Sequence, residues 1–360
     1  MRPRRAFVAF ACPLAAVVLV LGGCGGSDDG DGDSASTAVE SRPAPPRSAF
    51  PSAKGKTLAE VLEAEDAKPS TLVVSPAARA FYVGENRYPF GVFERDHTQV
   101  PDAEVALYLA KMPGSSKPQN GSGAGAEAPG RKTEKRTLDQ PAIGPYPAAI
   151  ESIVTQPAFR AQTTTSDPDA ASVVYATEID FPSEGDWLVA ALIREGEELT
   201  AALLPSAAVG TYARVPRVGQ EAPLIHTPTP EDAGGDVSAI TTRIPPDTQN
   251  RVDYADVLGE KPIALLFATP QFCESRVCGP VVDVAEQVKE TYGDEVEFIH
   301  MEIFRDNDPS KGPRPQVRAF HLPTEPWLFA IDRDGRIGAA IEGAFGVEEL
   351  TRVVEGLTGE

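Results

Sequence analysis

The sequence predicts a multidomain protein with an all-β N-terminal domain, built as a β-sandwich, and an α/β C-terminal domain. The chain has 360 residues, which is long enough for two folded domains. Short strand-like segments bounded by Pro and Gly occur through residues 57–215, as in a sandwich. Apolar runs then alternate with amphipathic helical patterns over residues 216–360, which is typical of an α/β domain.

The first 23 residues are typical of a secretion signal. Arginines at positions 2, 4 and 5 precede an uncharged apolar stretch, 6–21, of about sixteen residues, shorter than the roughly twenty that span a membrane. The stretch ends Leu21-Gly22-Gly23-Cys24, which resembles the lipobox of bacterial lipoproteins. The resemblance implies a diacylglyceride on Cys24, insertion of this lipid into the bilayer, and a position on the extracytoplasmic face of the bacterial cell membrane. A plain signal peptide or an uncleaved anchor is the alternative.

Composition predicts two segments without regular structure and excludes one class of partner. Residues 24–56 are rich in Ser, Pro, Asp and Gly without periodicity, so we expect a disordered tether. Residues from about 113 to 141 have a similar composition and a basic cluster, Arg131 to Arg136, which we interpret as a flexible, solvated insertion in the β domain. The net charge of −20 argues against nucleic acid as a partner.

The β domain is predicted from a series of short apolar segments. The expected strands are 71–74, 87–93, 104–109, 173–179 and 188–193. Between the last two, Phe181-Pro182-Ser183-Glu184-Gly185-Asp186-Trp187 resembles a hairpin turn of immunoglobulin-like extracytoplasmic modules. The resemblance implies an immunoglobulin-like sandwich that binds or spaces and does not catalyse. We predict no site in this domain, and we expect His97 to lie in an exposed loop.

The C-terminal domain is predicted from alternating strands and helices. Residues 262–267 are continuously apolar, as in a strand that is covered on both faces. Apolar residues at helical spacing then predict a helix over 279–292. We expect further strands at 295–303 and 326–332, a hairpin turn at 332–337, and a final amphipathic helix over 346–357.

Two cysteines stand where the first of these strands leads into its helix. If Cys12 leaves with the signal and Cys24 carries the lipid, as the lipobox resemblance implies, Cys273 and Cys278 are the thiols that remain, in a compartment where disulfides persist. Residues five apart on a helix have Cα atoms about 8 Å apart, beyond the roughly 7 Å limit for a disulfide. If the two cysteines bond, Cys273 must therefore precede the helix and Cys278 must lie at its start. Pro280 is tolerated in a first helical turn and supports this placement.

From Val218-Gly219-Gln220-Glu221-Ala222-Pro223 onward, the order of segments resembles the thioredoxin-like superfamily, in its redoxin branch. The resemblance implies a redox-active disulfide, with Gly279 and Pro280 in a Cys-Gly-Pro sequence and Pro326 as the cis-proline near the disulfide. The motif departs from Cys-Gly-Pro-Cys, because four residues separate Cys273 from Cys278. Either cysteine can align with the family's nucleophile, and that choice stays open. Arg276 lies between the two cysteines. Either its positive charge lowers the pKa of a neighbouring cysteine thiol, or it is simply a charged residue of the loop.

Three functions fit these observations. The first is a membrane-tethered thiol–disulfide oxidoreductase whose catalytic residues are Cys273 and Cys278 and whose partners are extracytoplasmic protein thiols or disulfides. The second is a non-catalytic binding or assembly lipoprotein with a structural disulfide. The third is a copper chaperone similar to the Sco type, in which His321 would join the two cysteines, whereas His300 is expected in the core. The leading prediction requires no cofactor and no metal.

Overall fold

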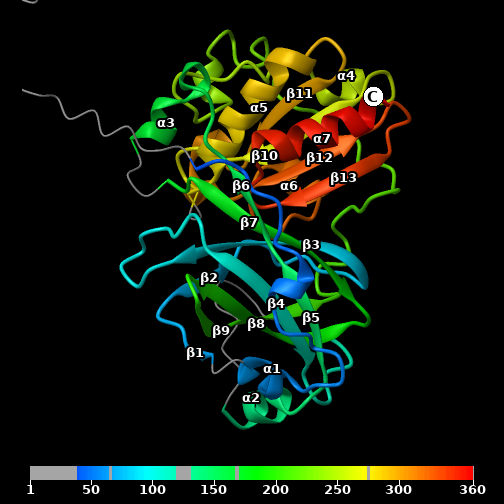
Figure 1. Cartoon of the computed structure of the whole chain (residues 1–360). Helices are drawn as coiled ribbons and strands as arrows, with labels where there is room; N and C mark the ends of the chain where they lie inside the picture. The colour runs from blue at the N-terminus through cyan, green and yellow to red at the C-terminus, as the bar shows by residue number, and fades with distance from the viewer. Residues whose placement is uncertain (1–38, 65–66, 119–130, 167–169, 274–275, 360) are drawn as a thin grey trace, which may run out of the picture. The chain divides into compact units, whose positions relative to one another are not determined.

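The fold is taken from a computed structural model, which describes residues 39–64, 67–118, 131–166, 170–273 and 276–359. Three sheets organise these residues (Figure 1). The predicted signal sequence and Cys24 lie outside the described residues. Within the described part of the chain, no helix has the length and apolar character needed to cross a membrane.

Two of the sheets form the N-terminal part of the fold. The five-stranded sheet has the order β1 (Lys68–Pro69), β9 (Glu198–Val209), β8 (Gly185–Glu195), β4 (Glu104–Lys111) and β5 (Ala142–Pro147). The four-stranded sheet has the order β2 (Val73–Pro76), β3 (Gly84–Phe93), β7 (Val173–Phe181) and β6 (Ala149–Ser152). Pairing is antiparallel except between β1 and β9.

A shared core joins the two sheets. Phe90 of β3 and Tyr175 of β7 stack with ring centroids 5.4 Å apart, and they belong to the same buried cluster as Leu107 of β4 and Val189 of β8. The alternation of buried and less buried residues along β7 and β3 follows from the period of two in a strand. The chain therefore contains the two stacked sheets that its sequence predicts. The finer assignment as an immunoglobulin-like sandwich stays a prediction.

Two segments that the sequence predicted to lack regular structure are folded in part. Residues 39–56 belong to the folded part, with Phe50 and Ala53 buried against the outer face of the five-stranded sheet beside helix α1 (Leu58–Leu62). The expectation of a disordered tether over 24–56 is therefore wrong for its second half, because these apolar side chains bury surface that composition alone does not reveal. Similarly, the basic residues Arg131 to Arg136 lie in helix α2 (Arg131–Leu138). Leu138 at the end of this helix packs against the same apolar core as Phe50 and Ala53.

The third sheet and its helices form the C-terminal part. Its order is β11 (Glu297–Glu302), β10 (Ile263–Ala268), β12 (Trp327–Ile331) and β13 (Ile337–Glu342). Strands β10 and β11 are parallel, whereas β12 is antiparallel to β10 and β13 to β12. Helices α5 (Cys278–Tyr292) and α7 (Val347–Thr358) cover one face, while α4 (Tyr254–Val257) and α6 (Pro315–Ala319) contribute to the core on the other. The elements therefore follow one another in a β-α-β then β-β-α order, as the sequence predicts for this α/β domain.

One connection of the first part reaches the third sheet. Between β6 and β7 the chain leaves the sandwich as residues 153–172, which we call the β6–β7 excursion, and forms a 3-10 turn (Pro157–Phe159) and the short helix α3 (Gln162–Thr165). Both pack against α5, and Figure 1 shows α3 beside that helix. The excursion thus brings residues of the sandwich sequence to the cysteine-bearing helix.

Candidate active site at the Cys273–Cys278 disulfide

The two cysteines form a disulfide at the junction between β10 and α5. Their Cα atoms lie 5.9 Å apart, within the ordinary range for a disulfide. Cys278 is the first residue of α5, and Cys273 lies in the loop that follows β10. The structure therefore has the placement that helical geometry required, with one cysteine before the helix and the other at its start.

The two sulfurs have different surroundings. Cys278 is fully buried in the cluster beneath α5, whereas Cys273 is partly exposed. The backbone N–H of Cys278 donates a hydrogen bond to Sγ of Cys273 at 3.3 Å. Because this N–H belongs to the first turn of α5, the positive end of the helix dipole acts on the sulfur of Cys273 as well as on that of Cys278.

The predicted supporting residues lie between the two cysteines, directly after Cys278, and before β12. Gly279 and Pro280 are buried in the first turn of α5. Arg276 has a φ of 59°, and its N–H donates to the carbonyl of Cys273 in the turn between the cysteines. The Glu325–Pro326 bond is cis and directly precedes β12, as the resemblance implied for Pro326. The roles of these residues in exchange stay predictions.

A buried ion pair attaches the β6–β7 excursion to α5. Asp283, which is 1% exposed, accepts from Nε of Arg243 at 2.9 Å and from the N–H of Ala161 at 3.0 Å. Arg243 also donates to the carbonyl of Phe159 at 2.8 Å. Burial raises the pKa of Asp283, and the hydrogen bond from Ala161 and the charge of Arg243 counter part of that shift. One carboxylate thus connects three segments that are distant in sequence.

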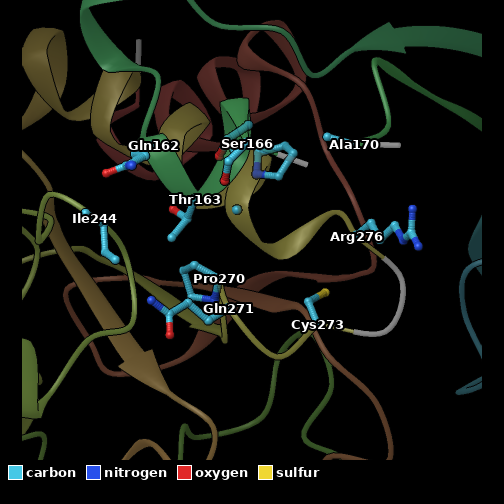
Figure 2. A pocket seen from close by; sticks show the side chains of 12 residues that line it. Gln162, Thr163, Ser166, Ala170, Ile244, Pro270, Gln271, Cys273 and Arg276 are labelled. Carbon is cyan, nitrogen blue, oxygen red and sulfur yellow. The ribbon is translucent and has the colours of Figure 1, made fainter. Parts of the chain in front are cut away.

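A pocket of about 310 Å³ lies next to the disulfide loop, between that loop and α3. Its lining comes from α3 and the residues after it, from the disulfide loop, from the start of α5 and from the segment before α4 (Figure 2). The lining residues are Gln162, Thr163, Thr164, Ser166, Ala170, Ile244, Pro270, Gln271, Cys273, Arg276, Gly279 and Pro280. The β6–β7 excursion belongs to the domain for which we predicted no site, and it forms one wall of this pocket.

Buried polar residues hold the chain behind the disulfide loop. His300 of β11, 1% exposed, pairs through Nδ1 with Asp247 at 2.8 Å, and its Nε2 lies 3.1 Å from the carbonyl oxygen of Ala268. Burial alone would lower the pKa of His300, but the attraction of Asp247 outweighs it and raises that pKa to about 9. Burial alone would raise the pKa of Asp247, but the charge of His300 and the hydrogen bonds that Asp247 accepts lower this pKa to about 2. The expectation that His300 is a core residue is confirmed.

The other histidines do not join the cysteines. His321 is exposed and its Nε2 lies 3.1 Å from Nη2 of Arg214, while His97 is exposed in a loop as expected. Among the described residues, no group of three His, Cys, Asp or Glu side chains is arranged to hold a metal ion. The copper alternative therefore has no supporting geometry in the described part of the chain.

The third sheet, in the order β11-β10-β12-β13, and the disulfide at the start of α5 together form a compact α/β unit with a bonded cysteine pair. A solved structure, a thiol:disulfide interchange protein of the thioredoxin family from Chlorobium tepidum TLS, is similar to 39% of this chain and is covered over 97% of its own length. The two share 19% sequence identity, with a TM-score of 0.29. No family model matches the chain, and no curated protein matches it.

Proposed function

We propose that the protein is a thiol–disulfide oxidoreductase that acts outside the cytoplasm of a bacterium and is attached to the membrane through a lipid on Cys24. One observation carries the proposal: a disulfide joins the first turn of a helix to a partly exposed cysteine in the loop before it, in a thioredoxin-like sheet. Its partners are extracytoplasmic proteins with thiols or disulfides. The tether is supported by the lipobox-like sequence alone.

In this mechanism Cys273 is the sulfur that meets the partner. A partner thiolate attacks Sγ of Cys273, the Cys273–Cys278 bond breaks, and Cys278 leaves as a thiolate at the start of α5, where the helix dipole stabilises it. A second partner thiolate then attacks the partner sulfur of the mixed disulfide and releases Cys273 as a thiolate. The partner gains a disulfide and loses two electrons, which reside in the cysteine pair. Reduction of a partner disulfide follows the same steps in reverse.

The surroundings of each sulfur support this assignment of roles. Cys273 is the accessible sulfur, and the backbone N–H of Cys278, which donates a hydrogen bond to it, would also stabilise a thiolate there. Cys278 is fully buried and close enough to resolve a mixed disulfide without a large movement of the chain. A positive charge on Arg276 would favour the thiolate further.

The reduction potential of the pair in the full chain tests the proposal. Equilibration with glutathione, followed by alkylation and mass spectrometry, measures it. We expect a value between about −120 and −270 mV, the range of catalytic dithiols. A value below about −300 mV would mark a structural bond and would favour the binding or assembly lipoprotein, which the five-residue separation also favours.

Single cysteine variants test the assignment of roles. Cys278→Ser should accumulate a mixed disulfide with a peptide partner, because Cys273 can attack but nothing resolves the product. Cys273→Ser should accumulate far less, because the remaining thiol is buried. Equal trapping by both variants would contradict the assignment. For the tether, mass spectrometry of protein extracted from membranes should find diacylglycerol on Cys24, and Cys24→Ser should release the protein from the membrane fraction.

A further inference from the structure

We infer that the pocket between α3 and Cys273 binds an extended peptide segment next to the reacting cysteine of a protein partner, so that the β6–β7 excursion of the sandwich helps to select the substrate. This inference rests on the proposed exchange function and adds the surface on which the partner lies. Cys273 lines the pocket together with α3, so a chain bonded to its sulfur passes along that wall (Figure 2).

The polar lining suits a peptide backbone. Gln162 and Ser166 on the excursion and Gln271 in the disulfide loop are exposed, and none of their side chains hydrogen-bonds to a described residue. Amide and hydroxyl groups both donate and accept, which matches the alternating N–H and C=O groups of an extended chain. The walls thus offer hydrogen bonds to backbone groups on two sides of the pocket.

The apolar lining and the size limit what enters. Ile244, which is 44% exposed, and the rings of Pro270 and Pro280 supply apolar surface beside the polar groups. A volume of about 310 Å³ is at the lower end of the roughly 300–1,000 Å³ of small-ligand sites. The pocket therefore receives a short stretch of a longer chain, and the partner's remaining residues stay outside it.

The position of the pocket wall is fixed by the protein's own contacts. The N–H of Ala161 is held by Asp283, and the N–H of Gln162 donates to the carbonyl of Ile244 at 2.7 Å. Gly279 gives α3 room to approach, since a Cβ at that residue would lie 2.9 Å from Oγ1 of Thr164. A wall that is already ordered loses little entropy when a partner binds, which favours selective binding.

The test compares two disulfides with the same leaving group. The reduced full chain is mixed either with bis(2-hydroxyethyl) disulfide or with an unstructured ten-residue peptide whose single cysteine carries 2-mercaptoethanol in disulfide linkage. Cys273 attacks the peptide sulfur and mercaptoethanol leaves; Cys278 then displaces the peptide thiolate. Two electrons pass from the cysteine pair and two thiols form. Rapid quenching and mass spectrometry give the second-order rate constants.

We expect the peptide disulfide to react at least tenfold faster than the small disulfide. Ser166→Trp, which fills the pocket from the α3 side, should abolish this preference, and Gln162→Leu should reduce it about three- to tenfold, as loss of one hydrogen bond does. Thr165→Trp, the matched control at an exposed neighbour that does not line the pocket, should preserve the preference.

Three results would overturn the inference. Equal rate constants for the two disulfides in the unmodified protein would show that the pocket selects nothing. A preference that survives in Ser166→Trp, with an unchanged unfolding midpoint, would show that the peptide binds elsewhere. Absence of reaction with both disulfides would overturn the exchange function, and this inference with it. The other two results would overturn this inference alone.

Discussion

Replacing Asp283 with Ala should destabilise the protein more than any exposed ion-pair substitution, because it leaves Arg243 buried and without its counter-charge. Arg243 and Asp283 are 7% and 1% exposed, so water does not replace the lost carboxylate. Breaking a buried ion pair on one side costs about 3–5 kcal/mol. The N–H of Ala161 also loses its acceptor, which places the expected loss toward the upper end of that range.

Urea unfolding followed by circular dichroism measures this loss. With a slope of about 3 kcal/mol/M, the midpoint should fall by roughly 1 to 2 M. Lys68→Ala, which breaks an exposed pair with Glu198, is the control and should leave the midpoint unchanged. The double variant Arg243→Met/Asp283→Leu should recover most of the loss, since apolar residues of similar volume replace buried pairs at little cost. An unchanged midpoint in Asp283→Ala would contradict the account of the excursion's attachment.

Three further contacts are tested by substitution, each through the urea unfolding midpoint. Gly279→Ala should lower the free energy of unfolding by about 1–3 kcal/mol, because its Cβ meets a threonine hydroxyl of α3. Gly356→Ala, at a position in α7 with open space, is the control and should raise it by about 0.5–1 kcal/mol. Equal effects of the two substitutions would contradict the tight approach of α3 to α5. The raised pKa of His300 contributes stability that is fully present below pH 6.5 and is lost as pH rises through about 9. The lowered pKa of Asp247 contributes stability that is fully present above pH 3.8 and is lost as pH falls through about 2. Asp247→Asn should remove both dependences, and an unaltered pH profile would show that the pair does not titrate as described. Glu342→Leu should lose at least about 2 kcal/mol, because two backbone N–H groups of the segment before β3 donate to that buried carboxylate, and a smaller loss would mean that water replaces it.

Strands with a plain apolar pattern could be predicted from the sequence, and strands that depend on tertiary context could not. β10 is apolar throughout and was predicted within a residue, whereas β5, with Pro145 and Pro147, carries no such pattern. Proline is tolerated in β5 because this strand lies at the edge of its sheet. β9 was missed for a similar reason, since its alanines and Pro205 give no clear alternation.

The candidate site was predictable where it depends on local geometry. Helix rise and the disulfide distance limit were sufficient to place Cys273 in the loop and Cys278 at the helix start. The contribution of Gln162 and Ser166 was not predictable, because more than a hundred residues separate them from the cysteines and no pattern marks them as polar pocket residues. The burial of Asp283 was not predictable either, because helical spacing places it on the side of α5 opposite Val281, beside Gln287, where an acid is ordinarily exposed.

Because of the β6–β7 excursion, the sandwich and the disulfide-bearing domain cannot be separated by truncating the chain between them. Ile153, the first residue of the excursion, and Val174, just beyond its end, belong to the same core cluster as Val281 and Val284 of α5. A fragment that begins at residue 216 retains the third sheet and its helices but exposes this apolar surface and the Asp283 carboxylate to water. Exchange of one half for an unrelated domain would have the same effect, so the sandwich and the disulfide-bearing domain are best expressed and engineered as a single unit.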